Sequence, residues 1–332
     1  MTTRLTLFAA LAGIALTFAC DVPLQERYEL RSSTSIPKGI GYDSVAQVFY
    51  ATALNGGEIT LITSLGREYL FYASDDRKIS FTAAAVDDER RVLWVCAVDR
   101  KSEPALPKSS ILGFDLDEQE IVHRVDLGDL RDRFAPSACE ALDVSKEGIV
   151  YAADALQPVI YRFDPGSTEA SIFVDDATLA PPHEGGVGLS GVALHPDGEH
   201  LLAAMSDPPR LFVIAIDEPT ALQEVLFPDK ALGRVGDPRL PAAAGIGFVG
   251  EQLYVAFPGA VQQLTFADQD QLRTAHVKTT VKVPNGISAL TAADGAAYAI
   301  DSDAYRVEQL GLQPDGEFSI VRVSPQLFQE DK

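Results

Sequence analysis

A degenerate phrase recurs along this chain about every 41 to 56 residues. Each copy opens with a small residue and a short apolar stretch, followed by a turn and a second apolar stretch. The six copies begin at Ile36, Phe81, Ser137, Leu189, Ala243 and Pro284. Self-similarity at such a period is typical of stacked supersecondary units, none of which can bury its apolar face alone. Six copies indicate a closed ring.

The pattern inside each copy favours strands. Val48, Tyr50 and Thr52 alternate with a period of two, and tight hairpin turns are expected at Asp197-Gly198 and Asp294-Gly295. A third strand is expected after each hairpin, over residues 58–62, 111–116, 159–163, 210–216, 261–266 and 306–310, usually with a fourth. Four strands make a propeller blade, so the sequence predicts an all-β, six-bladed β-propeller over residues 36–325.

Charge and length limit the class of protein. The 332 residues have a formal net charge of −21, which argues against a nucleic-acid partner because such partners require Lys and Arg to neutralise phosphates. A propeller accommodates this length as one domain. We expect a monomer whose partner is a small molecule or a protein at the central channel.

The first residues form a separate segment. Arg4 precedes an apolar run over residues 5–19, which has the length of a signal-peptide core and ends at Cys20. This resembles a bacterial lipoprotein signal, in which the Cys receives a lipid. We therefore expect a signal peptide over 1–19, a lipid-anchored tether over 20–35, and a periplasm-facing protein of the bacterial cell envelope. An ordinary secretory signal and an uncleaved anchor are the alternatives.

Two further cysteines, Cys96 and Cys139, lie in apolar strand patterns. Export would permit a disulfide, but we expect two small buried thiols, because free Cys packs as a minor hydrophobic residue. No CxxC or Cys/His cluster supports a zinc finger or a c-type haem. Trp94, between apolar neighbours, is expected in the core, and His195 and His200 at the surface of a hairpin turn.

Three blade phrases carry a resemblance to a known family. IPKGIGYD, SACEALDVSKEGIVYAADALQPVIYRF and LSGVALHPDGEHLLAAMSD resemble blades one, three and four of the gluconolactonase-like, senescence-marker-protein group of six-bladed propellers. The resemblance covers residues 36–323. It implies a divalent metal, usually calcium, at the top of the central channel, and hydrolysis of lactones or organophosphates in active members. The implied ligands are one Glu, two Asn and one Asp.

The ligand positions implied by the resemblance hold other residues here. Lys38 replaces the Glu, Ala138 and Ser190 replace the two Asn, and Ala244 replaces the Asp. Calcium prefers six to eight oxygen ligands, so the resemblance predicts a propeller that has lost its metal, with no cofactor. A shift of one residue at Ala138 stays open, since Cys139 and Glu140 follow directly.

Lys38 has two interpretations. Its ammonium could hold an anionic ligand, polarise a carbonyl or, with a lowered pKa, act as a base or Schiff-base amine. Alternatively, it pairs with an acidic neighbour or points to solvent. Other expected residues of the channel mouth are Ser190, Asn285, Asp154 and His183. Asp154, with the other strand-end residues Asp99, Asp207 and Asp301, could instead cap a turn.

Two hypotheses follow. The first is a lipid-anchored propeller that binds a ligand or partner without catalysis. The second is an enzyme, either a lactonase-like hydrolase or a metal-independent catalyst using Lys38, similar in concept to strictosidine-synthase-like propellers. We favour the first, because the ligand set implied by the resemblance is missing.

Overall fold

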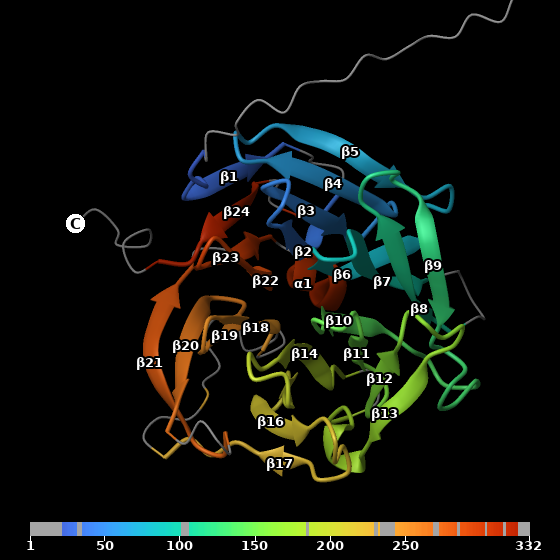
Figure 1. Cartoon of the computed structure of the whole chain (residues 1–332), viewed down its shortest axis with the longest axis vertical. Helices are drawn as coiled ribbons and strands as arrows, with labels where there is room; N and C mark the ends of the chain where they lie inside the picture. The colour runs from blue at the N-terminus through green and yellow to red at the C-terminus, as the bar shows by residue number, and fades with distance from the viewer. Residues whose placement is uncertain are drawn as a thin grey trace, which may run out of the picture.

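Six four-stranded antiparallel sheets surround a central channel in the computed structural model of the chain (Figure 1). The structure describes residues 22–31, 35–100, 106–183, 186–228, 232, 243–267, 272–283, 286–302, 304–314 and 317–324. The prediction of an all-β, six-bladed propeller is confirmed. The proposed signal peptide and Cys20 lie outside the described residues.

The strands of each blade follow one another from the channel outward. Blade one has β2 (Pro37–Asp43), β3 (Val48–Ala53), β4 (Glu58–Thr63) and β5 (Glu68–Ala73). Blade two has β6 (Ile79–Asp87), β7 (Val92–Asp99), β8 (Lys108–Asp115) and β9 (Ile121–Asp126). Blade three has β10 (Cys139–Val144), β11 (Val150–Asp154), β12 (Val159–Phe163) and β13 (Ser171–Asp175), followed by the 3-10 helix η1 (Ala177–Leu179).

The second half of the ring repeats this arrangement. Blade four has β14 (Leu189–Leu194), β15 (His200–Met205), β16 (Arg210–Ala215) and β17 (Gln223–Glu224). Blade five has β18 (Gly245–Val249), β19 (Gln252–Phe257), β20 (Ala260–Phe266) and β21 (Ala275–Lys282). Blade six has β22 (Ile287–Ala293), β23 (Ala296–Asp301), β24 (Phe318–Arg322) and β1 (Arg27–Leu30), and the helix α1 (Ala304–Leu310) lies between β23 and β24.

The ring closes through the N-terminal strand. β1 pairs antiparallel with β24, with Tyr28 opposite Ile320, and so supplies the outer strand of the last blade. Strand β1 falls inside residues 20–35, which we predicted to be a tether. That prediction is wrong for these four residues, because Tyr28 and Leu30 are buried against the first and last blades. The propeller therefore begins earlier in the chain than the repeats indicate.

Each interface between neighbouring blades contains one apolar cluster. The inner strands β2, β6, β10, β14, β18 and β22 contact one another in sequence, and β22 contacts β2. The six clusters of buried side chains each join two adjacent blades. As predicted, Trp94 belongs to the core, between blades two and three. Because no blade covers its own apolar face, removing one would expose two clusters.

Local turn chemistry explains the hairpins but not the last blade. Gly198 and Gly295 have φ of 75° and 72°, values that favour glycine, so both predicted hairpin turns are confirmed. The strand predicted over residues 306–310 is wrong, since these residues belong to α1. Tyr305 and Glu308 are three residues apart, which on a helix places both on one face. The third strand of this blade is β24 instead.

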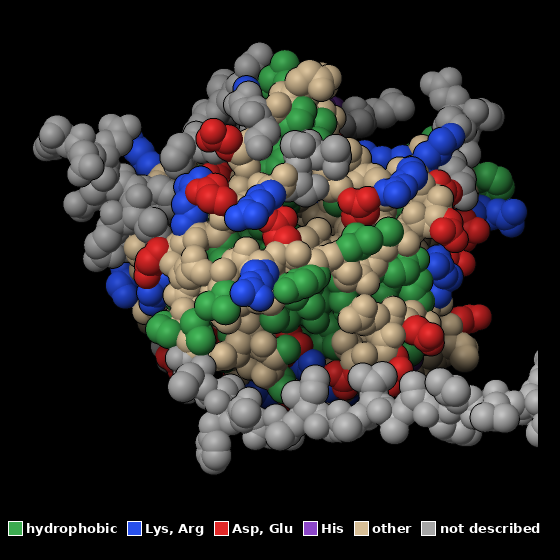
Figure 2. All heavy atoms as spheres, turned by 90° about the horizontal axis from the view of Figure 1, so that it is seen from above, with side chains coloured by type: hydrophobic (Ala, Val, Ile, Leu, Met, Phe, Trp, Pro, Cys, Tyr) green, Lys and Arg blue, Asp and Glu red, His purple; other side chains and the backbone are tan. Residues whose placement is uncertain are grey.

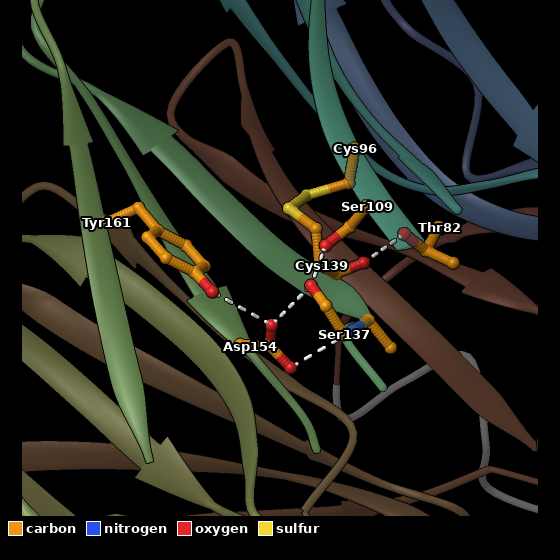
Figure 3. Close-up of a disulfide and its surroundings, with 8 residues drawn as sticks. Thr82, Cys96, Ser109, Ser137, Cys139, Asp154 and Tyr161 are labelled. Atoms are coloured by element: carbon orange, nitrogen blue, oxygen red, sulfur yellow. Dashed lines mark hydrogen bonds between the residues drawn. A yellow bond between two sulfur atoms is a disulfide. The ribbon is translucent and has the colours of Figure 1, made fainter. Parts of the chain in front are cut away.

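Cys96 and Cys139 form a disulfide between β7 and β10, which joins blades two and three (Figure 3). Our expectation of two free thiols is therefore wrong. Both residues are buried, as expected, but their Cα atoms are 5.5 Å apart, within the range for a disulfide. The apolar pattern indicated burial correctly but contained no information about which strands face each other across a blade interface.

The rim of the ring is mixed in character. Figure 2 shows hydrophobic side chains among acidic and basic ones on the side seen from above Figure 1. Exposed apolar side chains occur on several blades, among them Tyr69 and Leu70 of β5. In the described part of the chain, no helix has the length and apolar character needed to cross a membrane.

Candidate functional site at the central channel

The central channel has two different ends. The inner strands begin near Lys38, Glu140 and Ser190, and their final residues line a cavity at the opposite end. We refer to the first as the closed end, defined by Lys38, Glu140, Tyr305 and Glu308. The second is the open end, defined by the residues that line its cavity. Helix α1 lies across the centre of the ring in Figure 1.

Lys38 lies between two carboxylates at the closed end. Its Nζ is 2.7 Å from Glu140 of β10 and 2.6 Å from Glu308 of α1, and only 1% of the residue is exposed. The same Nζ lies 3.8 Å from the ring centroid of Tyr305, within range of a cation–π interaction. Arg100 forms a second ion pair with Glu308. Side chains from blades one, two, three and six thus meet at this end.

Tyr305 extends the cluster across the channel. Its hydroxyl is 2.9 Å from a Glu140 carboxylate oxygen and 3.1 Å from the backbone carbonyl of Ala244, at the start of blade five. Tyr305 is buried, and burial, together with the charge of Glu140, raises the pKa of its hydroxyl well above the ordinary value. The hydroxyl therefore stays protonated and donates a hydrogen bond. The charged side chains of the closed end therefore pair with one another.

The electrostatics of the closed end keep Lys38 charged. Burial lowers the pKa of Lys38, but Glu140 and Glu308 outweigh that effect and raise it above its ordinary value. Burial also acts on Glu308, yet the nearby Lys38 and Arg100 lower its pKa to about 2. For Glu140, burial dominates and raises the pKa. A protonated, doubly paired lysine matches the acidic-neighbour interpretation and does not suit a base or an amine nucleophile.

The other predicted mouth residues do not form one site. Ser190 is buried, lines a narrow cavity of about 50 Å³ below the closed end, and its Oγ is 3.5 Å from the carbonyl of Ala204. His183 is exposed on the connection to blade four. Asn285 lies outside the described residues.

Asp154 has a structural role. One carboxylate oxygen accepts hydrogen bonds from the backbone N–H groups of Ala138, Leu156 and Gln157. The other accepts from Ser137, at 2.7 Å, and from the Tyr161 hydroxyl, at 3.2 Å (Figure 3). The fully buried carboxylate therefore caps a turn beside the disulfide, as the alternative interpretation held.

The open end is a cavity of about 390 Å³. Its wall is formed by the last residues of all six inner strands and the turns that follow: Tyr42, Ser44, Ala84, Ala85, Val86, Asp88, Leu142, Asp143, Val144, Val192, Leu194, Ile246, Gly247, Phe248, Leu290, Thr291, Ala292, Ala293, Asp294 and Gly295. This wall includes three aspartates and neither lysine nor arginine. Asp143 accepts hydrogen bonds from the N–H groups of Val144 and Leu194, both 2.8 Å long. Burial nevertheless raises its pKa to about 6.

The sequence did not identify most of these residues. The sequence pointed to Glu140 only as a neighbour of Ala138. The strand wrongly predicted over 306–310 lies within α1, the helix that carries Tyr305 and Glu308. The spacing of Tyr305 and Glu308 on a short helix was the available signal. Asp143 lies near the end of the inner strand β10, and the inner strands β2 and β6 also end in an aspartate, so nothing in its local pattern distinguished it.

Comparison with known proteins supports the fold. No family model and no curated protein matches the chain. The solved structure of the major Malassezia sympodialis allergen Mala s 1 is similar, with a TM-score of 0.71 and 17% identity over 91% of this chain and 97% of that one. A Xanthomonas campestris gluconolactonase has a TM-score of 0.57 and 13% identity, covering 90% and 89% of the two chains.

A putative oxidoreductase (glucose dehydrogenase) from Thermus thermophilus is also similar, with a TM-score of 0.58 and 16% identity over 89% of this chain and 98% of that one. At these identities, the similarity establishes a shared propeller fold. A gluconolactonase is among the proteins that share it, in agreement with the resemblance seen in the blade phrases. Activity depends on the site and does not follow from the fold.

Proposed function

We propose that this protein is an exported, lipid-anchored propeller that binds a ligand without catalysing a reaction, and that an internal ion-pair cluster has replaced the metal of gluconolactonase-like propellers. One observation carries the proposal. At the end of the channel where the resemblance implies a metal, the Lys38 ammonium lies between Glu140 and Glu308, under the ring of Tyr305.

The residues at the closed end do not fit calcium. A calcium ion takes six to eight oxygen ligands and needs compensating negative charge. The carboxylates of Glu140 and Glu308 both already pair with Lys38, whose own positive charge would repel a cation. Ala138 and Ala244 supply no side-chain oxygen, and the Ser190 hydroxyl lies near a backbone carbonyl. These residues therefore support no catalytic step through a metal.

Export and anchoring rest on two observations. The apolar run before Cys20 has the features of a lipoprotein signal. The Cys96–Cys139 disulfide supports an oxidising compartment, because such bonds are rare in cytosolic proteins. Incorporation of labelled palmitate that is lost in Cys20→Ala would support the anchor, and equal labelling of both chains would exclude it.

Calorimetric titration and a hydrolysis assay test the absence of metal-dependent catalysis. We expect no saturable heat with calcium chloride, because the carboxylates of the closed end are neutralised by Lys38. We also expect no hydrolysis of glucono-1,5-lactone above the uncatalysed rate, with or without a chelator. Stoichiometric calcium binding, or hydrolysis that a chelator abolishes, would contradict the proposal. Chelator-resistant hydrolysis lost in Lys38→Met would instead favour the enzyme hypothesis.

The open end is where we place the ligand. Three aspartates without a basic residue in the wall favour a positively charged ligand, and Tyr42 and Phe248 add aromatic surface. We expect choline to bind at least about tenfold more tightly than its neutral isostere 3,3-dimethyl-1-butanol, since a charge pair near the surface contributes about 1 to 4 kcal/mol. Calorimetry at pH 7.5 measures both affinities.

Asp143 is expected to carry much of this preference. Its pKa of about 6 means that its charge is lost as the pH falls through that value, so choline should bind more weakly at pH 5 than at pH 7.5. Asp143→Asn should abolish this pH dependence. Asp164→Asn, in an exposed turn outside the cavity wall, is the control with the same charge change. Equal affinities for choline and its isostere would exclude a cation site.

A further inference from the structure

Two histidines and one aspartate converge in the hairpin turn between β14 and β15 of blade four. The Nδ1 atoms of His195 and His200 are both 2.8 Å from the same Asp197 oxygen, Oδ2. All three donor atoms lie within 4.8 Å of one another. Among the described residues, this is the group whose His, Cys, Asp or Glu donors are close enough together to hold a metal ion.

The turn fixes the positions of these side chains. The other carboxylate oxygen of Asp197 accepts the backbone N–H groups of Glu199, at 2.7 Å, and His200, at 3.1 Å. His195 and His200 are joined by a 2.9 Å backbone hydrogen bond, and Gly198 has the positive φ that the turn requires. Turn formation therefore uses Oδ1 of Asp197. It does not account for two imidazoles meeting at Oδ2.

Hydrogen bonding within the cluster is not self-consistent at His195. Its Nδ1 is 3.3 Å from the backbone N of Asp197, a donor, and 2.8 Å from Oδ2 of the same residue, an acceptor. A ring nitrogen is either a donor or an acceptor in a given state. If Nδ1 carries a proton, that proton faces the N–H of Asp197, which is also a donor. If Nδ1 carries none, its lone pair faces a negatively charged carboxylate oxygen. A cation bound by the Nδ1 lone pair and the carboxylate would relieve the second conflict.

We propose that His195, Asp197 and His200 bind a divalent first-row transition ion such as zinc, copper or nickel. Imidazole nitrogens with one carboxylate suit these ions. Donors about 2.05 Å from a metal lie about 2.9 Å apart at right angles and about 3.3 Å apart in the tetrahedral geometry of zinc. The spacings of 2.8 Å seen here match the first geometry and need to widen by about 0.5 Å for the second. Asp197 supplies the negative charge, because its carboxylate oxygen Oδ2 is the atom that both imidazoles approach.

The proposed ion lies beside the open end of the channel. The His195 ring packs edge-on against Phe248, with the ring centroids 5.1 Å apart, and Phe248 and Leu194 both belong to the cavity wall. The side chains of His195, Asp197 and His200 are 10%, 29% and 18% exposed, so solvent reaches the cluster. Three protein ligands leave at least one coordination position for water or another ligand.

Cobalt and zinc titrations of the chain, prepared without a histidine tag, test the proposal. We expect one equivalent of cobalt to give visible d–d absorption bands that zinc removes by competition. His195→Ala and His200→Ala should each weaken zinc binding at least about tenfold, since even the groups that only orient a ligand contribute that much. His183→Ala, at an exposed histidine elsewhere in the chain, should leave the affinity unchanged.

Asp197→Asn tests whether Asp197 binds the metal ion or only stabilises the turn. Asparagine retains the oxygen that accepts the turn N–H groups but loses the charge. We expect this variant to unfold at the same temperature as the original chain in EDTA, yet to bind zinc at least about tenfold more weakly. The proposal is wrong if cobalt gives no d–d bands, or if zinc affinity is the same in all variants. His195, Asp197 and His200 belong neither to the closed end nor to the wall of the open-end cavity, so the outcome can be distinguished from that of the calcium and choline experiments above.

Discussion

Lys38→Met should lower the free energy of unfolding by about 3 to 5 kcal/mol, the range measured when one partner of a buried ion pair is removed. The change leaves the carboxylates of Glu140 and Glu308 buried without their shared cation. Arg100 still pairs with Glu308, so Glu140 bears most of the penalty. Urea denaturation at pH 7 and 25 °C measures the difference from the unchanged chain.

The pH dependence gives this prediction a second test. Lys38 and Arg100 hold the pKa of Glu308 at about 2, below its ordinary value of 4.5. This lowered pKa stabilises the fold fully above pH 4.5, and the contribution is lost as the pH falls toward 2. Lys38→Met removes part of it, so the difference between the two chains should shrink as the solution is acidified.

Two further variants show whether charge or packing is responsible. Lys282→Met changes an exposed lysine in the same way and should shift stability by less than about 0.5 kcal/mol. Adding Glu140→Gln to Lys38→Met should recover part of the loss, because the uncompensated carboxylate is gone. If Lys38→Met unfolds at the same urea concentration as the original chain, the ion pairs do not support the closed end.

The architecture could be predicted because it depends on features repeated locally. Six copies of one phrase fixed the number of blades, and glycines with positive φ, such as Gly198 and Gly295, marked the hairpins. Strand β1 was missed because it is not part of a repeat. Its burial depends on a pairing with β24 almost three hundred residues away in sequence, and no local pattern records such a pairing.

The candidate site was predicted less well, because its members come from distant segments. The sequence predicted that Lys38 lies at the start of an inner strand, and an acidic partner was one of several interpretations of its side chain. The identity of its acidic partners depends in part on where α1 lies, and the residue pattern of α1 had been interpreted as a strand. Asp154 illustrates the opposite case. Its three backbone N–H partners all lie within 16 residues of it in sequence, and the turn-capping interpretation was available.

The disulfide gives the second large effect expected. Cys96→Ala with Cys139→Ala should lower the free energy of unfolding by about 4 kcal/mol, the chain-entropy value for a loop of this size. The two cysteines are 43 residues apart in sequence and join blades two and three. Without the bond, the unfolded chain gains freedom while the folded interface keeps its apolar cluster. Urea denaturation of both chains without reductant measures the loss.

Unfolding of the reduced protein separates the stability that the disulfide contributes from the stability that apolar packing around it contributes. Both cysteines are fully buried, so a reductant reaches them mainly when the chain opens, and samples must equilibrate with it in urea. Under those conditions the original chain should unfold at nearly the same urea concentration as the double variant, whose own midpoint should not respond to reductant. A double variant as stable as the oxidised chain would mean that the cysteines act only as small apolar residues. The link between blades two and three would then come from the apolar cluster and from the buried Ser109, Ser137 and Asp154 hydrogen bonds beside it.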